Sequence, residues 1–409
     1  MSVSSVVIVG AGQGGFQTAA SLRQAGFTGT VTLIGDEPSL PYQRPPLSKA
    51  YLLGKIGTDA LCFRKREFFA EHRIDLMHDA VVAVDRTNQR VLLHSGRAVP
   101  YDHLVLALGA HNRALPVPGA DLEGVFGLRT LSDADCIARR MSACRNAIVV
   151  GAGFIGLEFA AVAAARGMSV QVLELGTRVM ARAVSTETSD FFRKAHESWG
   201  VNVRFAQGLT CINGIDGQVA SVETTDHQQL PADLVVFGIG VLPNVTLAAE
   251  AGLDIENGIR VDANLLTSDP SISAIGDCAS FPSPHADRHV RLESVQNAAD
   301  QARCVAARIA GERKPYSAVP WFWTDQQDLM LQIAGLSEGH DSTVVLGSAS
   351  KRQLSLLCFR RNQLIAVESI NRASDHLAAR KLLARGSTPT PAEASDERFE
   401  LKTFEAATR

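Results

Sequence analysis

The chain has 409 residues, of which 46% are hydrophobic and 20% are charged, a balance typical of a globular protein with large cores. This length is enough for two or three domains. The formal net charge is −3, so no basic field draws the protein to nucleic acid or to an anionic membrane surface. We therefore expect neither a nucleic-acid partner nor a membrane partner.

The seven cysteines are dispersed, and no two of them form a C-x-x-C pair. An odd number of scattered thiols in a long chain argues against a disulfide framework. An iron–sulfur cluster needs four ligands that are usually closely spaced. We expect no metal centre and thiols that mostly pack as small hydrophobic groups. The cysteines are Cys62, Cys136, Cys144, Cys211, Cys278, Cys304 and Cys358.

Two apolar segments need to be distinguished from targeting or membrane segments. The N-terminal residues 1–10 have no basic region and no small-residue cleavage site, so they are typical of a strand rather than a signal peptide. The longest apolar run, 147–165, contains Glu158 and is interrupted by a Gly-x-Gly. This pattern favours a strand, turn and helix over a membrane span. We expect a cytoplasmic protein.

An internal repeat carries the first functional signal. Each copy is a short β-branched run, then G-x-G-x-x-G, then an alanine-rich segment. The first glycine permits a tight turn, the second lets a pyrophosphate approach the backbone, and the third lets the helix pack on the sheet. The helix N-terminus offers free N–H groups to the phosphates. The repeat therefore predicts two dinucleotide-binding units. The glycines are Gly10, Gly12 and Gly15 in the first copy, and Gly151, Gly153 and Gly156 in the second.

Each copy is followed by an acidic residue after its second strand. Asp36 follows the expected strand 30–35, and Glu174 follows the expected strand 169–173. Both acids lie about 20 residues beyond the third glycine, where a carboxylate meets the ribose hydroxyls. A carboxylate at Glu174 favours NADH, because it repels the 2′-phosphate of NADPH. Arg178 and Arg182 lie just downstream and weaken this argument.

Further motifs carry a family resemblance. The chain resembles the pyridine-nucleotide-dependent flavoprotein reductases of the glutathione-reductase fold, and among them the ferredoxin reductases of bacterial oxygenase systems. The resemblance runs from Val6 to about residue 385. Its most specific elements are Pro45-Pro-Leu-Ser-Lys49, Arg129-Thr-Leu-Ser-Asp133-Ala, Gly276-Asp277-Cys278, Glu293-Ser-Val-Gln-Asn-Ala and Pro320-Trp321-Phe-Trp323-Thr-Asp-Gln.

The resemblance implies an α/β fold with two Rossmann-like dinucleotide-binding domains and a C-terminal α+β domain. The FAD domain would comprise residues 1–109 and 240–319, the NADH domain residues 110–239, and the C-terminal domain residues 320–409. Short alternating strands from Trp321 onward, followed by a basic helix over 372–385, agree with the third domain. The stretch 386–397, rich in Ser, Thr, Pro, Ala and acids, is expected to be loose.

The resemblance also implies which residues hold the two nucleotides. For FAD, Gly14 and Asp36 would hold the adenosine half, and Lys49 would lie over the flavin near its reactive nitrogen. The remaining FAD contacts would be Gly10, Gly12 and Gly15 at the pyrophosphate, Val82 on the adenine side, Arg129 near the flavin phosphate, Gly276 and Asp277 at the ribitol, and Val295 at the pyrimidine edge. The NADH contacts would be Gly151, Gly153, Gly156, Glu174 and, near the nicotinamide carboxamide, Glu293.

The catalytic residues implied by the resemblance are Lys49, Glu158, Trp321 and Trp323. Glu158 would pair with Lys49 beside the nicotinamide. The two tryptophans would shield the flavin or provide a short route to the surface, and strand alternation would put them on the same side. Each assignment has a structural alternative. Lys49 and Glu158 are compatible with surface charges, and the tryptophans, Val82 and Val295 with core packing.

The electron acceptor is inferred from what the residues around Lys49 lack. Residues 40–49 contain no cysteine, so neither the dithiol relay of disulfide reductases nor the single cysteine of related oxidases is available. A flavin without a thiol relay suits single-electron transfer, and the resemblance implies an acidic [2Fe–2S] ferredoxin as partner. A basic rim would speed that encounter. Candidate basic groups are Arg64-Lys65-Arg66, Arg303 and Arg313-Lys314.

We therefore expect an enzyme, an FAD-containing NADH:ferredoxin reductase. Its ferredoxin would supply an oxygenase, either a haem monooxygenase or a ring-hydroxylating dioxygenase. Two alternatives stay open. One is a rubredoxin reductase, which has the same chemistry and a different carrier. The other is an NADH-sensing flavoprotein of the apoptosis-inducing type, which would signal by changing its association.

Overall fold

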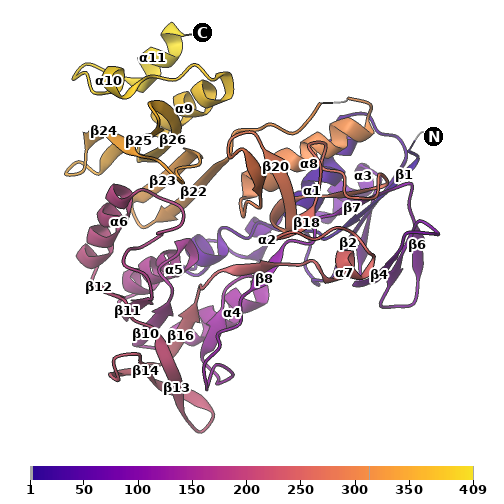
Figure 1. The fold of residues 1–409 in the computed structure, drawn as a ribbon. Helices are drawn as coiled ribbons and strands as arrows, with labels where there is room; N and C mark the ends of the chain where they lie inside the picture. Colours follow the sequence, from indigo (N-terminus) through magenta and orange to yellow (C-terminus); the bar gives the residue numbers. More distant parts are fainter. Residues whose placement is uncertain (1–2, 313, 409) are drawn as a thin grey trace. The chain divides into compact units, whose positions relative to one another are not determined.

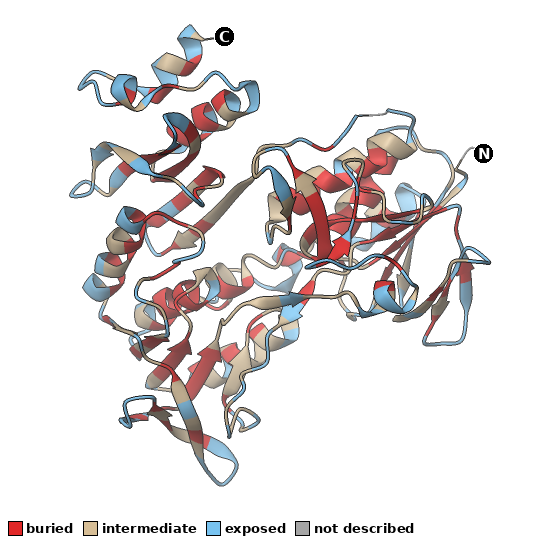
Figure 2. Ribbon diagram, viewed as in Figure 1, coloured by how far each residue is buried: buried red, intermediate tan, exposed pale blue. Residues whose placement is uncertain are grey.

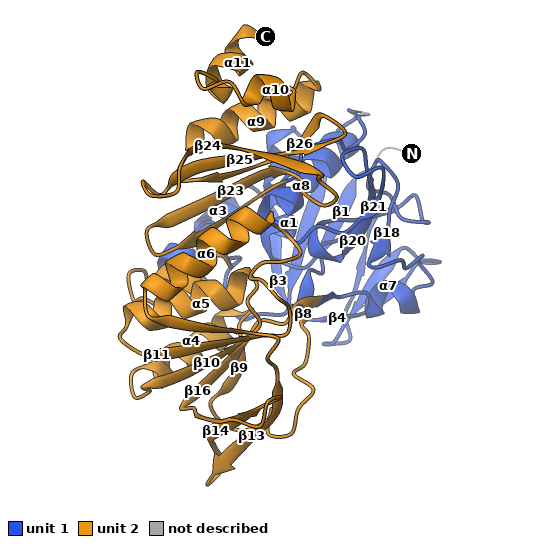
Figure 3. Ribbon diagram, turned by 60° about the vertical axis from the view of Figure 1, so that its left-hand side comes forward, with its two compact units in different colours: residues 1–43, 58–111, 242–320 blue, residues 44–57, 112–241, 321–409 orange. Residues whose placement is uncertain are grey.

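The computed structural model describes residues 3–312 and 314–408. The chain forms two compact units (Figure 3). Unit 1 comprises residues 1–43, 58–111 and 242–320, and unit 2 comprises residues 44–57, 112–241 and 321–409. The first glycine-rich motif belongs to unit 1. The second glycine-rich motif, the C-terminal segment and residues 44–57, which carry Lys49, belong to unit 2.

Unit 1 is built on a five-stranded parallel sheet with the strand order β19-β7-β1-β2-β3 (Figure 1). Nearly all residues of the central strand β1 are buried (Figure 2), as expected for a parallel sheet covered by helices. Helices α1 and α8 pack against each other. The bounds are β1 (Ser5–Val9), α1 (Gln13–Gln24), β2 (Thr30–Gly35), β3 (Ile74–His78), β7 (His103–Leu106), β19 (Ile272–Ala274) and α8 (Val295–Ile309).

Smaller elements complete unit 1. An antiparallel meander joins β3 to β7 in the chain, and a three-stranded sheet follows the link from unit 2. The meander comprises β4 (Val81–Asp85), β5 (Arg90–Leu93) and β6 (Ala98–Pro100), and the second sheet comprises β18 (Ile259–Arg260), β20 (Ala279–Ser283) and β21 (Arg288–Val290). The short helices are α2 (Thr58–Leu61), α3 (Arg66–Glu71), α7 (Thr246–Glu250) and the 3-10 turn η2 (Gly276–Cys278).

Unit 2 repeats the plan of unit 1. Its parallel sheet has the order β12-β11-β10-β16-β9, and the antiparallel meander β13-β14-β15 again precedes the fourth strand of the motif. The repeat in the sequence is therefore a repeat of the whole supersecondary unit. The bounds are β9 (Val125–Gly127), α4 (Leu131–Met141), β10 (Asn146–Val150), α5 (Phe154–Ala165), β11 (Ser169–Glu174), α6 (Thr186–Ser198), β12 (Val201–Phe205), β13 (Leu209–Ile215), β14 (Gln218–Thr224), β15 (Gln229–Pro231) and β16 (Leu234–Phe237).

The rest of unit 2 is the single-turn π-helix η1 (Leu47–Tyr51) and the C-terminal α+β part. The C-terminal strands form an antiparallel sheet with the order β22-β23-β26-β25-β24. Strands β8 (Ala110–Asn112) and β17 (Val241–Pro243) lie where the chain passes between the units. The C-terminal bounds are β22 (Trp321–Gln326), β23 (Leu329–Gly335), β24 (Ser342–Ser348), β25 (Gln353–Arg360), β26 (Gln363–Ile370), α9 (Ala373–Arg385), α10 (Pro391–Ala394) and α11 (Leu401–Ala407).

One expectation about secondary structure is wrong. The stretch 386–397 is not wholly loose, because Thr390 and Glu393 form a capping box that starts α10, and Ala394 is buried in the C-terminal core. Asp277 lies within the 3-10 turn η2, which strand β20 follows. Within the described residues, none of the helices is long and apolar enough to cross a membrane.

Candidate nucleotide-binding and active site

In the first glycine-rich loop, which belongs to unit 1, two glycines have no room for a side chain and the third one does. Gly10 has φ +102°, and a Cβ atom there would lie 2.2 Å from the backbone oxygen of Ala107. A Cβ atom at Gly15 would lie 1.8 Å from the backbone oxygen of Gly10. Around Gly12, by contrast, nothing lies within 4 Å of an added Cβ. The loop is therefore pinned to the sheet at both ends and exposes backbone in between.

The second loop, in unit 2, has the same construction. Gly151 has φ +95°, and its Cβ would lie 2.7 Å from the backbone oxygen of Gly238. A Cβ at Gly156 would lie 2.1 Å from the Gly151 oxygen, whereas the nearest atom to a Cβ at Gly153 is 3.8 Å away. Only glycine combines the positive φ with this close approach of backbone. Both motifs therefore have the local geometry that dinucleotide loops require.

The helices that follow the loops leave their first N–H groups available. Gly12 is the N-cap of α1 and Gly153 is the N-cap of α5, and neither helix has a side-chain cap. An uncapped N-terminus beside open backbone suits a pyrophosphate, because the orphan N–H groups and the helix dipole favour an anion. The residues present fit the pyrophosphate of a dinucleotide in each unit.

The two predicted acidic residues differ in their surroundings. Glu174 accepts hydrogen bonds from the backbone N–H of Ala152 at 2.7 Å and of Gly176 at 2.6 Å, so its carboxylate is held against the glycine-rich loop. Asp36 is exposed at the end of β2. The next residue, Glu37, accepts a hydrogen bond from the Tyr42 hydroxyl at 2.6 Å. The spacing from the third glycine does not distinguish Glu37 from Asp36.

In the sequence, Arg178 weakens the case for NADH. In the structure, its guanidinium binds backbone oxygens of a nearby loop. Its guanidinium donates to the backbone oxygens of Ala181 and Val184 at 2.6 and 2.8 Å. These bonds close the loop before α6, so the Arg178 charge is used to fix that loop. Arg182 is exposed.

The structure brings Lys49 and Glu158 together. Lys49 Nζ lies 2.8 Å from Glu158 Oε1, and the two side chains are 16% and 2% exposed. The Ser48 hydroxyl also donates to Glu158 Oε2, and Lys49 Nζ donates to the Pro45 oxygen at 3.3 Å. Glu158 is thus a buried carboxylate with one cationic and one neutral donor. Such partners offset the free-energy cost of burying a charge. The alternative of surface charges is wrong for Glu158.

Trp321 and Trp323 lie on the same side of β22, as strand alternation predicts, with ring centroids 5.8 Å apart. Arg380 stacks 4.4 Å from the Trp321 ring centroid, and the His376 ring lies 5.1 Å away. Both tryptophans are half-buried rather than core residues. Sequence reasoning missed the two α9 residues because their contact with Trp321 depends on how α9 packs on the sheet.

A short network surrounds Asp277 in unit 1. Arg291 donates to the backbone oxygen of Asp277 at 3.2 Å and forms an ion pair with Glu293 at 2.8 Å. The Gly276 N–H donates to Gln301 Oε1 at 2.7 Å. Arg291 therefore ties together two residues that the sequence selects separately. Nothing in the sequence motif singles out Arg291 or Gln301.

The other predicted FAD contacts lie in varied surroundings. The Arg129 carbonyl accepts a hydrogen bond from Arg44 at 2.8 Å. Gly14 is buried against Ile275, which would lie 3.2 Å from an added Cβ. Val295 is the half-buried first residue of α8.

Core packing does not account for Val82. It is 49% exposed, because a register shift between Val81 and Ala83 leaves it unpaired in a β-bulge. The alternative of core packing is therefore wrong for this residue, and an exposed apolar side chain at this place needs another explanation.

All seven cysteines are free, and burial raises the pKa of Cys278 to about 11.

Most of the candidate basic residues are exposed in unit 1, namely Arg64, Lys65, Arg66, Arg303 and Lys314. Arg313 lies outside the described residues. Arg303 pairs with Asp300 at 2.6 Å, which reduces what it offers to a partner.

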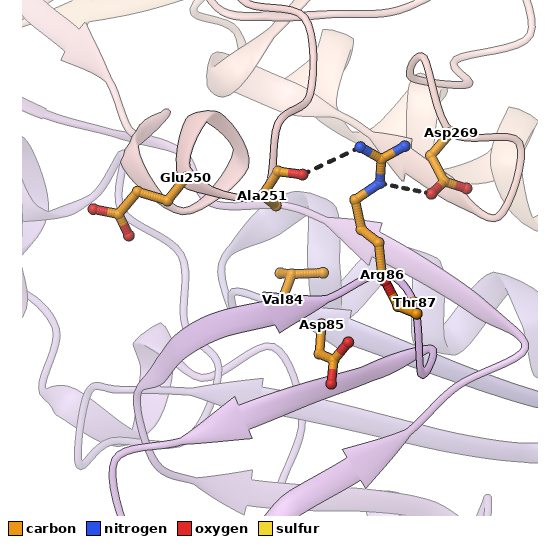
Figure 4. A pocket seen from close by; sticks show the side chains of 7 residues that line it. All are labelled: Val84, Asp85, Arg86, Thr87, Glu250, Ala251 and Asp269. Atoms are coloured by element: carbon orange, nitrogen blue, oxygen red, sulfur yellow. Dashed lines mark hydrogen bonds and ion pairs between the residues drawn. The ribbon is translucent and has the colours of Figure 1, made fainter.

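A pocket in unit 1 contains none of the predicted site residues (Figure 4). It is lined by Val84, Asp85, Arg86, Thr87, Glu250, Ala251 and Asp269. Arg86 donates to Asp269 at 2.8 Å and to the Ala251 oxygen at 3.2 Å. Its charge is used to join the meander to the loops beside it.

Comparison with known proteins identifies the family. The model of the pyridine nucleotide-disulphide oxidoreductases matches residues 4–302, and the model described as "Reductase C-terminal" matches residues 321–405. The chain belongs to the pyridine nucleotide-disulphide oxidoreductase family.

Several members of this family are similar along their whole length. Rhodocoxin reductase of Rhodococcus erythropolis is 51% identical over 97% of this chain and 93% of its own. The ferredoxin reductase for the CYP199A2 system of Rhodopseudomonas palustris has a crystal structure that matches with a TM-score of 0.96 and 50% identity, over 98% of this chain and 99% of that one. The covalent putidaredoxin reductase–putidaredoxin complex matches with a TM-score of 0.96 and 39% identity, over 100% and 99%. The glutathione-reductase fold with a C-terminal reductase domain is thereby shown.

Proposed function

We propose that this chain is an FAD-containing NADH:ferredoxin reductase whose [2Fe–2S] ferredoxin supplies an oxygenase, either a haem monooxygenase or a ring-hydroxylating dioxygenase. The observation that carries the proposal is the Lys49–Glu158 pair, which lies just beyond the second dinucleotide loop in a chain without paired thiols. The family's similar members support the carrier, since one is named a ferredoxin reductase and another was solved as a complex with putidaredoxin. We also propose that it works in the cytoplasm, where NADH is available.

The two nucleotides are assigned to the two loops. Unit 1 would hold FAD through the backbone around Gly12 and through Asp36 or Glu37, with Asp277 at the ribitol. Unit 2 would hold NADH through the backbone around Gly153 and through Glu174. The corresponding domains would be 1–109 with 240–319 for FAD, 110–239 for NADH, and 320–409 for the C-terminal part. FAD, when bound, accepts a hydride as two electrons and releases them singly.

The chain's own residues would orient the donor and exclude water. Hydride transfer needs the reacting atoms at roughly 3–3.5 Å in a dry site. Glu158 lies one turn into α5, which begins at the NADH loop, and Lys49 of η1 pairs with it at 2.8 Å. We infer that this pair fixes the nicotinamide end of the site. Trp321 and Trp323 would shield the flavin or carry electrons outward.

The partner would be an acidic ferredoxin. The exposed cluster Arg64, Lys65 and Arg66 provides three adjacent positive charges on unit 1. Complementary charge mainly raises the association rate and makes it sensitive to salt. We expect electron transfer to the ferredoxin to slow as ionic strength rises.

The test is cytochrome c reduction by the FAD-loaded protein with NADH, with and without a [2Fe–2S] ferredoxin. A large ferredoxin-dependent rate supports the proposal. The same gain with rubredoxin alone would make the protein a rubredoxin reductase. Flavin reduction by NADH with no gain from either carrier, and a long-lived reduced complex, would instead favour the NADH-sensing alternative.

A further inference from the structure

Strand β22 presents two different faces. Its odd-numbered residues include the paired tryptophans Trp321 and Trp323. On the even-numbered face, the Phe322 ring lies 4.4 Å from the Phe154 ring. Phe154 is the first residue of α5, and Glu158 is four residues further on, so both lie on one side of that helix. The C-terminal strand therefore runs along the helix that begins at the second dinucleotide loop.

Thr324, also on the even face, contacts Glu158 directly. Its hydroxyl donates to Glu158 Oε1 at 2.5 Å, and Thr324 is fully buried. Oε1 is the same oxygen that pairs with Lys49. A contact between residues 166 positions apart thus adds a third donor to the Glu158 carboxylate.

A buried hydrogen-bond chain continues behind Thr324. Gln326 Nε2 donates to the Thr324 hydroxyl at 3.3 Å, and the Gln326 Oε1 atom lies 2.7 Å from His196 Nε2. Gln326 and His196 are both almost completely buried. An amide oxygen accepts, so the His196 proton is on Nε2. Burial lowers the pKa of His196 to about 4, so the ring is neutral at pH 7.

Every donor in this chain points toward the carboxylate. Hydrogen bonds aligned in one direction polarise one another, and donors to a buried carboxylate favour its charged form. The charged or titratable groups against the chain are Lys49, beside Glu158, and His196 at the far end. Beyond His196, Trp199 stacks at 4.9 Å, and Arg352 lies 5.8 Å from the Trp199 ring centroid.

We propose that Thr324 and Gln326 are positioning residues for hydride transfer, which hold the Glu158 carboxylate charged and aimed at Lys49. This inference rests on the proposed function, because it takes the Lys49–Glu158 pair to act at the hydride step. The role is separate from electron exit, because Thr324 and Gln326 lie on the opposite face of β22 from the tryptophans. The C-terminal sheet therefore contributes to the reductive half of the reaction.

The experiment uses Thr324→Val, which keeps the shape and removes the hydroxyl, with Thr324→Ser as its rescue. Thr343→Val, in the same sheet, is the matched control, since the Thr343 hydroxyl bonds to Glu187 on the surface. Anaerobic stopped-flow gives the rate of flavin reduction by NADH across pH. The absorption spectrum of the oxidised flavin, recorded across pH without NADH, gives a readout independent of turnover.

We expect Thr324→Val to slow flavin reduction roughly 10-fold and to change the pH dependence of that rate, with a matching change in the spectral titration. Thr324→Ser should restore both. Oxidation of the reduced flavin by ferredoxin should be unchanged. A wild-type rate and pH profile in Thr324→Val would overturn the inference and leave the proposed function standing.

Gln326→Leu is a second variant that tests the proposal if Thr324→Val does not retain FAD. Gln326 does not touch Glu158, so its loss should change the rate and its pH dependence in the same way as Thr324→Val, but by less. An unchanged rate and pH profile of flavin reduction in Gln326→Leu would overturn the proposed role of this hydrogen-bond chain. Failure of NADH to reduce the wild-type flavin at all would overturn the proposed function, and this inference with it.

Discussion

The carboxylate of Glu368 accepts a hydrogen bond from the Ser185 backbone N–H at 2.8 Å and another from the Ser185 hydroxyl at 2.7 Å. Glu368 is fully buried on β26, and Ser185 is the N-cap residue of α6. The two donors and the positive end of the helix dipole stabilise this buried charge. The contact joins the C-terminal sheet to a helix of the second dinucleotide-binding fold.

Glu368→Leu should destabilise unit 2. The substitution leaves both Ser185 donors without their acceptor, at a cost on the order of 2–3 kcal/mol. Thermal unfolding followed by circular dichroism should show a lower Tm than for the wild type. Glu397→Ala, at an exposed position, is the control and should leave Tm unchanged. Equal Tm values for Glu368→Leu and the wild type would contradict the account of this contact.

Lys49→Met should slow the reduction of the flavin by NADH. The substitution keeps the length of the side chain but removes the ammonium that lies 2.8 Å from Glu158 Oε1. A misplaced and unpaired buried carboxylate should lower the rate roughly 10- to 100-fold. Lys55→Met, an exposed lysine in the same segment, is the matched control. Similar stopped-flow rates for the two variants would show that Lys49 has no role in this step.

Local chemistry made much of the nucleotide-binding architecture predictable. The glycine spacing determines the turn, and the structure shows the close backbone contacts of Gly10, Gly15, Gly151 and Gly156 that exclude any side chain. The expected strand 30–35 is found with the same bounds. These features depend on sterics within a few tens of residues, which a single sequence displays directly.

Features that depend on distant packing were not predictable. Thr324 reaches Glu158 only because β22 lies along α5, and no pattern near Thr324 encodes that contact. The exposure of Val82 follows from a β-bulge, which the alternation of residues around it does not reveal. The choice between Asp36 and Glu37 likewise depends on where Tyr42 lies. The sequence alone thus reveals the motifs but not these tertiary contacts.

Glu174→Ala should weaken the binding of NADH and relax the discrimination against NADPH. The carboxylate is fixed by two backbone N–H groups, and a rigid acceptor discriminates best between a ribose hydroxyl and a phosphate. We expect KM for NADH to rise by roughly 10-fold, with the ratio of kcat/KM for NADPH to that for NADH also rising. Asp216→Asn, in an exposed hairpin turn, should change neither value. An unaltered coenzyme preference in Glu174→Ala would argue against the ribose assignment.

Thiol modification should leave electron transfer intact. The seven cysteines are free, and burial raises the pKa values of Cys62 and Cys278, to about 11 for Cys278. A thiol with a raised pKa is poorly reactive near neutral pH. Treatment with iodoacetamide at pH 7, and the variant Cys62→Ser, should both retain the ferredoxin-dependent rate. Loss of that rate on modification would point to a thiol relay.

Stability should fall as the pH is lowered below the ordinary range of histidine, with a contribution from His376. Burial lowers the pKa of His376 from 6.5 to about 4, and within the described residues neither of its ring nitrogens has a hydrogen-bond partner. The unfolded chain therefore binds a proton at a higher pH than the folded one. The stabilisation is complete above pH 6.5 and is lost as the pH falls toward 4, by about 2 kcal/mol at pH 5.

His376→Leu removes this titration while keeping an apolar group beside Trp321. Its urea midpoint should therefore depend less steeply on pH between neutrality and pH 5 than that of the wild type. His94→Gln is the control, because His94 is exposed and its loss should leave the steep dependence in place. If His376→Leu keeps the full wild-type slope, the acid sensitivity arises at other groups, of which His103 and His196 have pKa values lowered by burial to about 3 and about 4.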